Sequence, residues 1–176
     1  MCYCVCMQYD LHPIFVHFPI ALLVFYSIIK IIPLSRWLPK IMWRDIERFL
    51  LVFGTLGAFV SLSTGEIAEE MFEVNHQLVE AHATFAVISV WLYGALIVGE
   101  VASYIVSRQF FVTQRYMTRS IAFVNSFLCN GFFARLIAFV AFVSILLTGL
   151  LGGVLVYGTT ADPLAGFILR ILGISI

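Results

Sequence analysis

The sequence predicts an all-α integral membrane protein, and three observations support this fold class. Hydrophobic residues make up 62% of the chain, whereas Asp, Glu, Lys and Arg together make up 11%. A soluble domain carries about 25% charged residues, so this chain has too little charge to cover a surface that faces water. The apolar runs are also long and uniform, unlike the alternating strands of a membrane barrel. These observations exclude a soluble enzyme, a disordered chain and a nucleic-acid binder.

Four apolar runs are long enough to form membrane-spanning helices. A helix needs about 20 residues to cross a hydrocarbon core that is about 30 Å thick. Each run contains no Asp, Glu, Lys or Arg and lies between two charged residues. These pairs are Asp10 and Lys30, Arg48 and Glu66, Glu80 and Glu100, and Arg135 and Asp162. We therefore predict a single transmembrane domain, residues 1–176, built as a four-helix bundle. The predicted spans cover about 12–32, 48–66, 79–101 and 134–158.

Two further apolar stretches, 120–134 and 163–176, are too short to span the bilayer. Runs of this length are more often interfacial or re-entrant than spanning. The first contains Asn125 and Asn130, and the second is interrupted by Arg170. We predict that the second stretch forms a short C-terminal interfacial helix.

The basic residues predict the orientation of the bundle. Of the 10 Lys and Arg residues, all but Arg170 lie at the inner ends of the predicted spans or in the connections that join the first span to the second and the third to the fourth. Lys and Arg collect on the cytoplasmic side of membrane proteins. Both connections should therefore lie inside, and both termini should face the outer side.

The four histidines gather at the predicted outer face. His12 and His17 open the first span, and His76 and His82 open the third. With a helical rise of about 1.5 Å per residue, His17 lies roughly 6 Å deeper than His12, and His82 lies roughly 9 Å deeper than His76. An ionisable side chain inside a span suggests function, so His17 and His82 are the predicted ligand pair.

The shallower histidines and the neighbouring small residues have a plainer interpretation. His12 and His76 lie near the interface, where a polar side chain costs little, although both remain candidates for the same site. Gly149, Gly152 and Gly153 in the fourth span either let helices pack closely or let a flat ligand lie against the backbone.

Two other patterns contain the residue types of metal sites. Glu73 and His76 form one E-x-x-H unit, but a di-iron bundle needs two such units and two further glutamates, which favours a solvated acidic loop. Cys2, Cys4 and Cys6 alternate, whereas metal-binding cysteines are usually spaced C-x-x-C. These cysteines could hold a soft metal weakly, be oxidised or be lipidated, and Met7 could be the true start of the chain.

The run HPIFVHFPIAL, residues 12–22, resembles the opening box of an uncharacterised prokaryotic integral-membrane family, domain-of-unknown-function family 2231. Members of that family begin with H-P-x-x-V-H-F-P-I-A-L ahead of four spanning helices. The segment 63–65 (STG), His82 and the segment 152–158 (GGVLVYG) match later parts of the family pattern in the same order. Gly158 and the two threonines after it stand where family members often carry another histidine.

This resemblance implies a redox role at the prokaryotic cytoplasmic membrane, because some relatives are joined to cytochrome c-like domains. Through the positions that match the family pattern, the resemblance makes His17 and His82 the ligand candidates and His12 the third.

The leading hypothesis is thus a b-type cytochrome-like protein rather than a stand-alone catalyst. It would bind haem b between His17 and His82 and exchange electrons with a quinone or a cytochrome c-like partner, alone or within a larger membrane complex. Two alternatives stay open: a cofactor-free structural or assembly subunit of such a complex, and a non-haem metal site of His and Glu.

Overall fold

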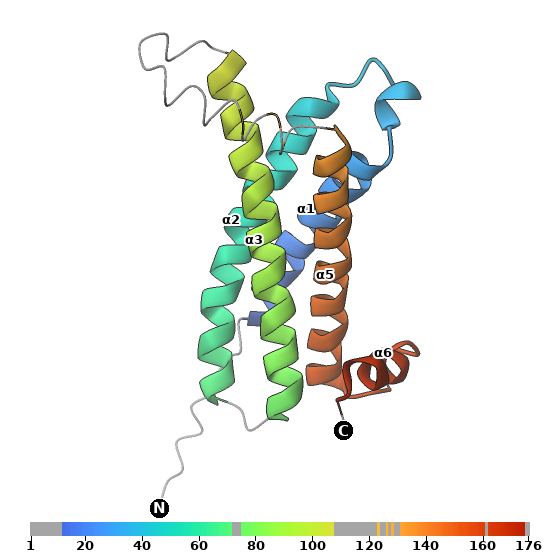
Figure 1. The fold of residues 1–176 in the computed structure, drawn as a ribbon. Coiled ribbons are helices and arrows are strands. Elements are labelled where there is room, and N and C mark those ends of the chain that lie inside the picture. Colours follow the sequence, from blue (N-terminus) through green and yellow to red (C-terminus); the bar gives the residue numbers. More distant parts are fainter. Residues whose placement is uncertain are drawn as a thin grey trace, which may run out of the picture.

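The computed structural model describes residues 12–71, 75–107, 131–160 and 162–174, together with 123, 126 and 128. Within these residues every regular element is a helix, which confirms the all-α prediction (Figure 1). The elements are α1 (His12–Ile31), the short 3₁₀ helix η1 (Leu34–Arg36), α2 (Trp43–Met71), α3 (His76–Ser107), α5 (Gly131–Tyr157) and α6 (Ala165–Leu172). The interpretations placed on Cys2, Cys4, Cys6, Met7 and Glu73 lie outside the described residues.

Three of the helices are long and apolar enough to cross a membrane, which supports the membrane class. Their apolar segments are Trp43–Gly65, His76–Ile105 and Gly131–Tyr157. Helix α1 contributes a shorter apolar segment, Phe15–Ile31. The observed α2 is longer at both ends than its predicted span, because charged residues such as Glu and Arg are good helix formers and let the helix continue beyond the hydrocarbon.

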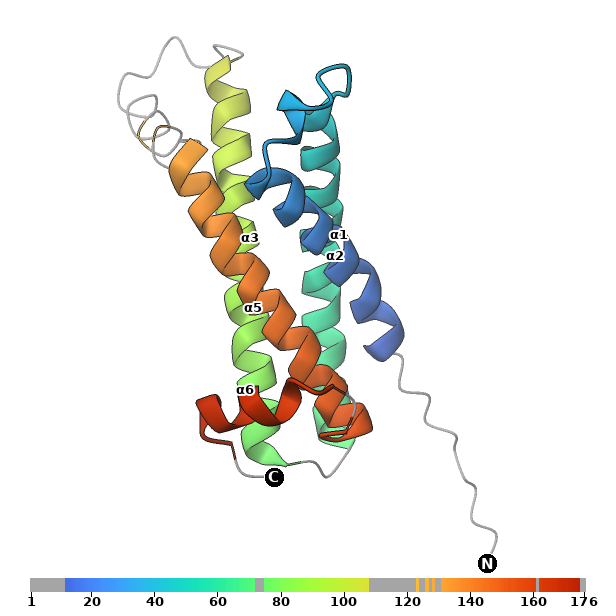
Figure 2. The same cartoon turned by 90° about the vertical axis from the view of Figure 1, so that its right-hand side faces the viewer.

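The helices pack side by side, as the two perpendicular views show (Figure 1 and Figure 2). Helix α1 contacts α2 and α5, and α3 contacts the same two helices. The main core joins Leu23 and Tyr26 of α1 to Tyr93 of α3 and to a run of alanines on α5. Small residues let helix backbones approach one another closely, which is how membrane helices gain packing contacts.

Glycines bring α1 and α2 close together. A Cβ added at Gly54 would lie 2.7 Å from Leu23 Cδ2, and one added at Gly57 would lie 3.1 Å from Pro19 Cβ. Ser61 also donates a hydrogen bond to the carbonyl of Phe15 at 3.4 Å. This face of α2 therefore requires small side chains.

A second apolar cluster joins α6 to the end of α5. It combines Leu78 of α3 with Leu151 and Val154 of α5 and with Ala165 and Leu169 of α6. Helix α6 lies beside the end of α5 in Figure 1 and crosses in front of the first part of α3 in Figure 2. The predicted C-terminal helix thus forms, with its other face exposed.

Two ends of the molecule matter for function. We call the end at which α1 and α3 begin the histidine end, since His12 and His76 are the first residues of these helices. We call the opposite end, at which α1 ends and α2 begins, the charged end. The histidine end also carries α6 (Figure 1).

Candidate functional site

The candidate histidines have different surroundings. His76 is the exposed first residue of α3, and His17 is exposed on α1. His82 is half-buried between α3 and α5. His12 is the first residue of α1, and its side chain lies outside the described part of the chain.

The half-buried His82 has a defined hydrogen-bond geometry. Its Nδ1 lies 3.0 Å from the backbone carbonyl oxygen of Thr148 on α5. A carbonyl oxygen can only accept, so Nδ1 carries a proton and donates it. In the neutral ring the lone pair is therefore on Nε2, which is the arrangement that a metal-ligating histidine adopts when its other nitrogen bonds a carbonyl.

Gly152 makes room for this imidazole. A Cβ at that position would lie 3.1 Å from His82 Cε1, which is tighter than an ordinary van der Waals contact. A Cβ added at Gly149 or Gly153 would meet nothing within 4 Å. We call these three residues the glycine face of α5. Gly152 leaves room for the imidazole of His82, and the space beside Gly149 and Gly153 is open.

The glycine face continues the side of α5 that packs on α1. Gly149 follows Ile145 by four residues and Gly152 follows it by seven, and these spacings keep side chains on one helix face. Ile145 belongs to the core cluster that includes Leu23 of α1. In both views α1 leans away from α5 toward the histidine end (Figure 1 and Figure 2). The α1 side of α5 therefore becomes open where its side chains become glycines.

His17 lies on the side of α1 that packs on the main core. It precedes Ile20 by three residues and Val24 by seven, so the three share a helix face. Ile20 and Val24 are partly buried against the main core. The exposed His17 thus continues the face of α1 that packs on the core.

A buried hydrogen bond gives the register between α1 and α3. Ser27 Oγ and the Tyr93 hydroxyl are 2.8 Å apart. His17 lies ten residues before Ser27 and His82 eleven residues before Tyr93. These separations correspond to about 15 Å and about 16 Å along the two helices. The two histidines are therefore displaced from this contact by similar distances, each along the axis of its own helix.

Larger groups of metal-ligand side chains are not found in the described part of the chain. Within it, no cluster contains three or more His, Cys, Asp or Glu side chains that could hold a metal ion. A pair of axial histidines is a smaller constellation, so this finding bears on the His/Glu metal site and not on haem.

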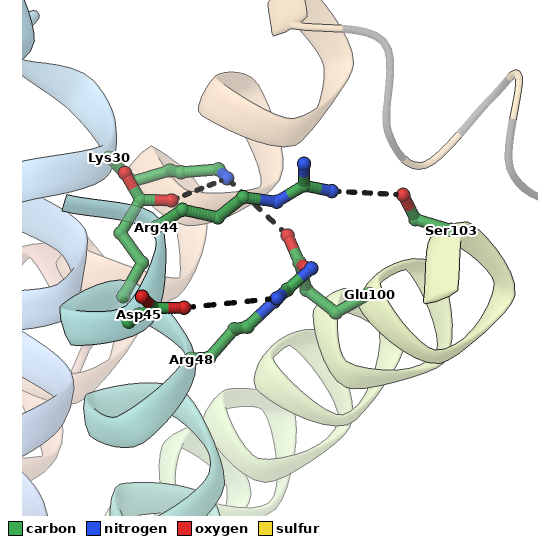
Figure 3. Close-up of polar contacts among 7 residues, drawn as sticks. Lys30, Arg44, Asp45, Arg48, Glu100 and Ser103 are labelled. Carbon is green, nitrogen blue, oxygen red and sulfur yellow. Dashed lines mark hydrogen bonds and ion pairs between the residues drawn. The ribbon is translucent and has the colours of Figure 1, made fainter. Parts of the chain in front are cut away.

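The charged end contains a network that sequence reasoning missed. Lys30 of α1 lies 2.9 Å from Glu47 of α2 and 3.9 Å from Glu100 of α3. Arg48 lies 3.2 Å from Glu100 and 4.0 Å from Asp45 (Figure 3). The network therefore ties α1, α2 and α3 together through side chains that are partly shielded by the helices.

The sequence contained part of the signal for this network. Lys30 and Glu100 stand at the inner ends of predicted spans, where they could either pair or extend to the headgroups. The structure shows the pairing and adds Glu47, which lies one residue before Arg48. Glu47 was not predicted as a partner because, in the sequence, it belongs to the predicted connection between the first and second spans. That connection has many charged residues, and any of them could have faced Lys30.

A pocket of about 390 Å³ lies beside this network. The charged residues Lys30, Arg44, Glu47, Glu100 and Arg135 line it. Arg44 donates a hydrogen bond to Ser103 Oγ at 3.3 Å (Figure 3). The pocket thus combines side chains from α1, α2, α3 and α5 at one end of the helices.

Comparison of the chain with protein-family models, with curated proteins and with solved structures finds no match. The resemblance of the opening box therefore stays a prediction, and function has to be argued from the geometry of the two ends.

Proposed function

We propose that this chain is a four-helix transmembrane protein whose charged end faces the cytoplasm and whose termini face the outer side. Helix α1 would be the fourth span. Its 20 residues correspond to about 30 Å of helix, the thickness of the hydrocarbon core. The orientation rests on the basic residues of the charged end, which include Lys30, Arg44 and Arg48.

Within this bundle we propose a b-type haem site near the outer face, where His82 and His17 would hold the iron. The observation that carries the proposal is the hydrogen bond from His82 Nδ1 to the Thr148 carbonyl. This bond orients the imidazole and leaves the lone pair of the neutral ring on Nε2. Such an outer-shell partner commonly fixes the tautomer of a ligating histidine.

The glycine face supports a flat ligand beside His82. Gly149 and Gly153 have open space where a side chain would stand. A planar macrocycle could approach the α5 backbone there, while His17 would reach it from α1. Helices α1 and α3 both contact α5, so ligands from these two helices would approach the glycine face from two sides.

The rest of the histidine end has groups for the polar edge of a haem. Haem propionates need cations or hydrogen-bond donors, and Arg170, Tyr157 and Thr159 are exposed at this end. A bound haem would supply one-electron chemistry, and the chain's own residues would hold the iron, exclude water and orient the ring. The protein would then carry electrons between a quinone or a partner protein and an acceptor on the outer side.

The test is a reduced-minus-oxidised absorption spectrum of the detergent-purified protein, produced in a host with ample haem. We expect a sharp α-band of the b type. His82→Ala and His17→Ala should each abolish or shift this band, because each removes one proposed iron ligand. His76→Ala is the matched control, since this exposed histidine opens the same helix as His82, and it should leave the spectrum unchanged. A flat wild-type spectrum would reject the haem site.

A cofactor-free structural subunit is the second candidate, and the same hydrogen bond favours it. The contact between His82 and Thr148 joins α3 to α5 without any ligand, and interhelical hydrogen bonds of this kind stabilise membrane helices. Under this hypothesis the spectrum is flat and the protein co-purifies from native membranes with fixed partners. In that case His82→Ala would lower stability without a spectral change.

A further inference from the structure

The pocket at the charged end has a ligand chemistry that the proposed haem site does not use. Its two carboxylates are already engaged: Glu47 with Lys30 at 2.9 Å, and Glu100 with Arg48 at 3.2 Å and Lys30 at 3.9 Å. The ion pairs therefore neutralise Lys30 and Arg48 without help from outside. Arg48 itself does not line the pocket, so the lining side chains comprise three cations and two carboxylates, which leaves one net positive charge.

Arg44 and Arg135 are the remaining cations. Both line the pocket and are exposed, so a ligand can reach them from outside the protein. Within the described residues neither guanidinium has a carboxylate within 4.0 Å, and Arg44 donates a hydrogen bond to the hydroxyl of Ser103. Guanidinium groups present paired N–H donors that match the oxygens of a phosphate group.

The level of the pocket indicates where such a phosphate comes from. The pocket lies where α1 ends and α2 and α5 begin, which is the boundary between the apolar segments and the charged connections. Trp43 lines it, and tryptophan is enriched at the headgroup level of membranes. Lipid phosphates lie at this level, and basic pockets between helices on the cytoplasmic side bind anionic headgroups.

The wall of the pocket also suits a lipid. Apolar side chains line it next to the charged ones, among them Ile32, Leu34 and Leu128. A phosphate held by the two arginines would therefore have apolar surface beside it for the start of an acyl chain. Ser35 and Ser103 provide hydroxyls for the polar part of the headgroup.

We propose that this pocket binds the phosphate group of an anionic phospholipid, with Arg44 and Arg135 as the binding residues. An anionic lipid fits better than a zwitterionic one because the lining has a net positive charge and because Arg44 and Arg135 have no carboxylate within 4.0 Å in the described part of the chain. The proposal needs the membrane placement given above but is independent of haem.

The test is native mass spectrometry of the detergent-purified full chain with phosphatidylglycerol or phosphatidylcholine added at equal concentration. We expect bound phosphatidylglycerol to exceed bound phosphatidylcholine. Arg44→Gln and Arg135→Gln should each weaken phosphatidylglycerol binding about fivefold, as expected for the loss of one cation near a lipid phosphate. The matched control is Arg36→Gln, which removes an exposed arginine at the same end that does not line the pocket.

Four results would overturn the proposal. Equal binding of the two lipids would show that the pocket does not select negative charge. An equal loss in Arg36→Gln would show diffuse attraction to the charged end rather than a site. Displacement of the lipid by millimolar inorganic phosphate would make this a phosphate-ion site. Arg44→Lys and Arg135→Lys retain the charge and should lose less phosphatidylglycerol binding than the Gln variants. Circular dichroism would check that each Lys variant keeps its helicity. A loss of binding equal to that of the Gln variants, with full helicity, would contradict a charge-binding site.

Discussion

The two ends of the molecule hold their polar groups in opposite ways. At the charged end, Lys30, Glu47, Arg48 and Glu100 satisfy one another across three helices. At the histidine end, His82 bonds a backbone carbonyl, and the neighbouring face of α5 consists of glycines, two of which border open space. The charged end therefore contributes to holding the helices together, while the glycine face at the histidine end has open space at two positions.

The difference between the two ends shows how a small helical protein can combine stability with open space for a ligand. Ion pairs that are partly shielded from water stabilise the fold only when every partner is present. Glycine and exposed imidazole add little packing energy but leave space. A site built at the histidine end can thus rely on the charged end, and on the shared core between them, for its rigidity.

The largest expected effect comes from filling the glycine face. Gly152→Leu would place a large side chain where even a Cβ is 3.1 Å from His82 Cε1, so the imidazole must leave its position. We expect loss of any haem spectrum and a clear fall in thermal stability in detergent. Gly94→Ala is the control, because a Cβ at that position meets nothing within 4 Å. A Gly152→Leu protein with an unchanged spectrum and melting temperature would refute the geometry proposed for His82.

The next effect sharpens the account of the charged end. Lys30→Met leaves Glu47 without its lysine partner, and we expect a loss of about 1–3 kcal/mol in unfolding free energy, the range for hydrogen bonds to charged groups. The double variant Lys30→Met/Glu47→Met should recover most of this loss, since replacing a whole shielded pair is often close to neutral.

The measurement for this pair is denaturant unfolding in mixed micelles, and Lys40→Met is the control because Lys40 is exposed on the connection. That control should change stability by less than about 0.5 kcal/mol. If the double variant were no more stable than Lys30→Met, the coupling between the two side chains would be disproved.

The smallest effect concerns the core between the two ends. Tyr93→Phe removes a hydroxyl that lies 2.8 Å from Ser27 Oγ and donates to the Leu23 carbonyl at 3.3 Å. We expect a loss of about 1 kcal/mol, as for a single buried interhelical hydrogen bond. Tyr157→Phe changes an exposed tyrosine and should have no measurable effect on the same unfolding curve. Equal behaviour of the two variants would argue against a shared core that links α1 to α3.

A large part of the fold was predictable from the residues. The low charge content and the long apolar runs predicted an all-helical chain of the membrane class, and the helices begin and end near the predicted positions. The C-terminal helix was also predicted, since Arg170 interrupts an apolar stretch too short to span. Helix ends were less accurate, as in α2, because hydropathy detects the hydrocarbon boundary and not the last helical residue.

The sites were only partly predictable. The position of His17 and His82 toward the same end of the bundle follows from the predicted topology, because α1 and α3 both begin at that end. Their surroundings do not follow from topology: His82 meets Thr148 and Gly152 of α5, whereas His17 is exposed. Likewise the ends of the predicted spans located Lys30 and Glu100, but not Glu47 as the closer partner.

By itself, the sequence determined the all-helical class of the protein and the order of its helices. The tertiary structure decided which side chains face one another. The physical reason is that α3 and α5 are apolar on nearly every side, so no polar stripe encodes their rotation about their own axes. That rotation comes from packing, through the alanines and glycines of α5 and the shared contacts of Tyr93, and it is what brings His82 to the glycine face.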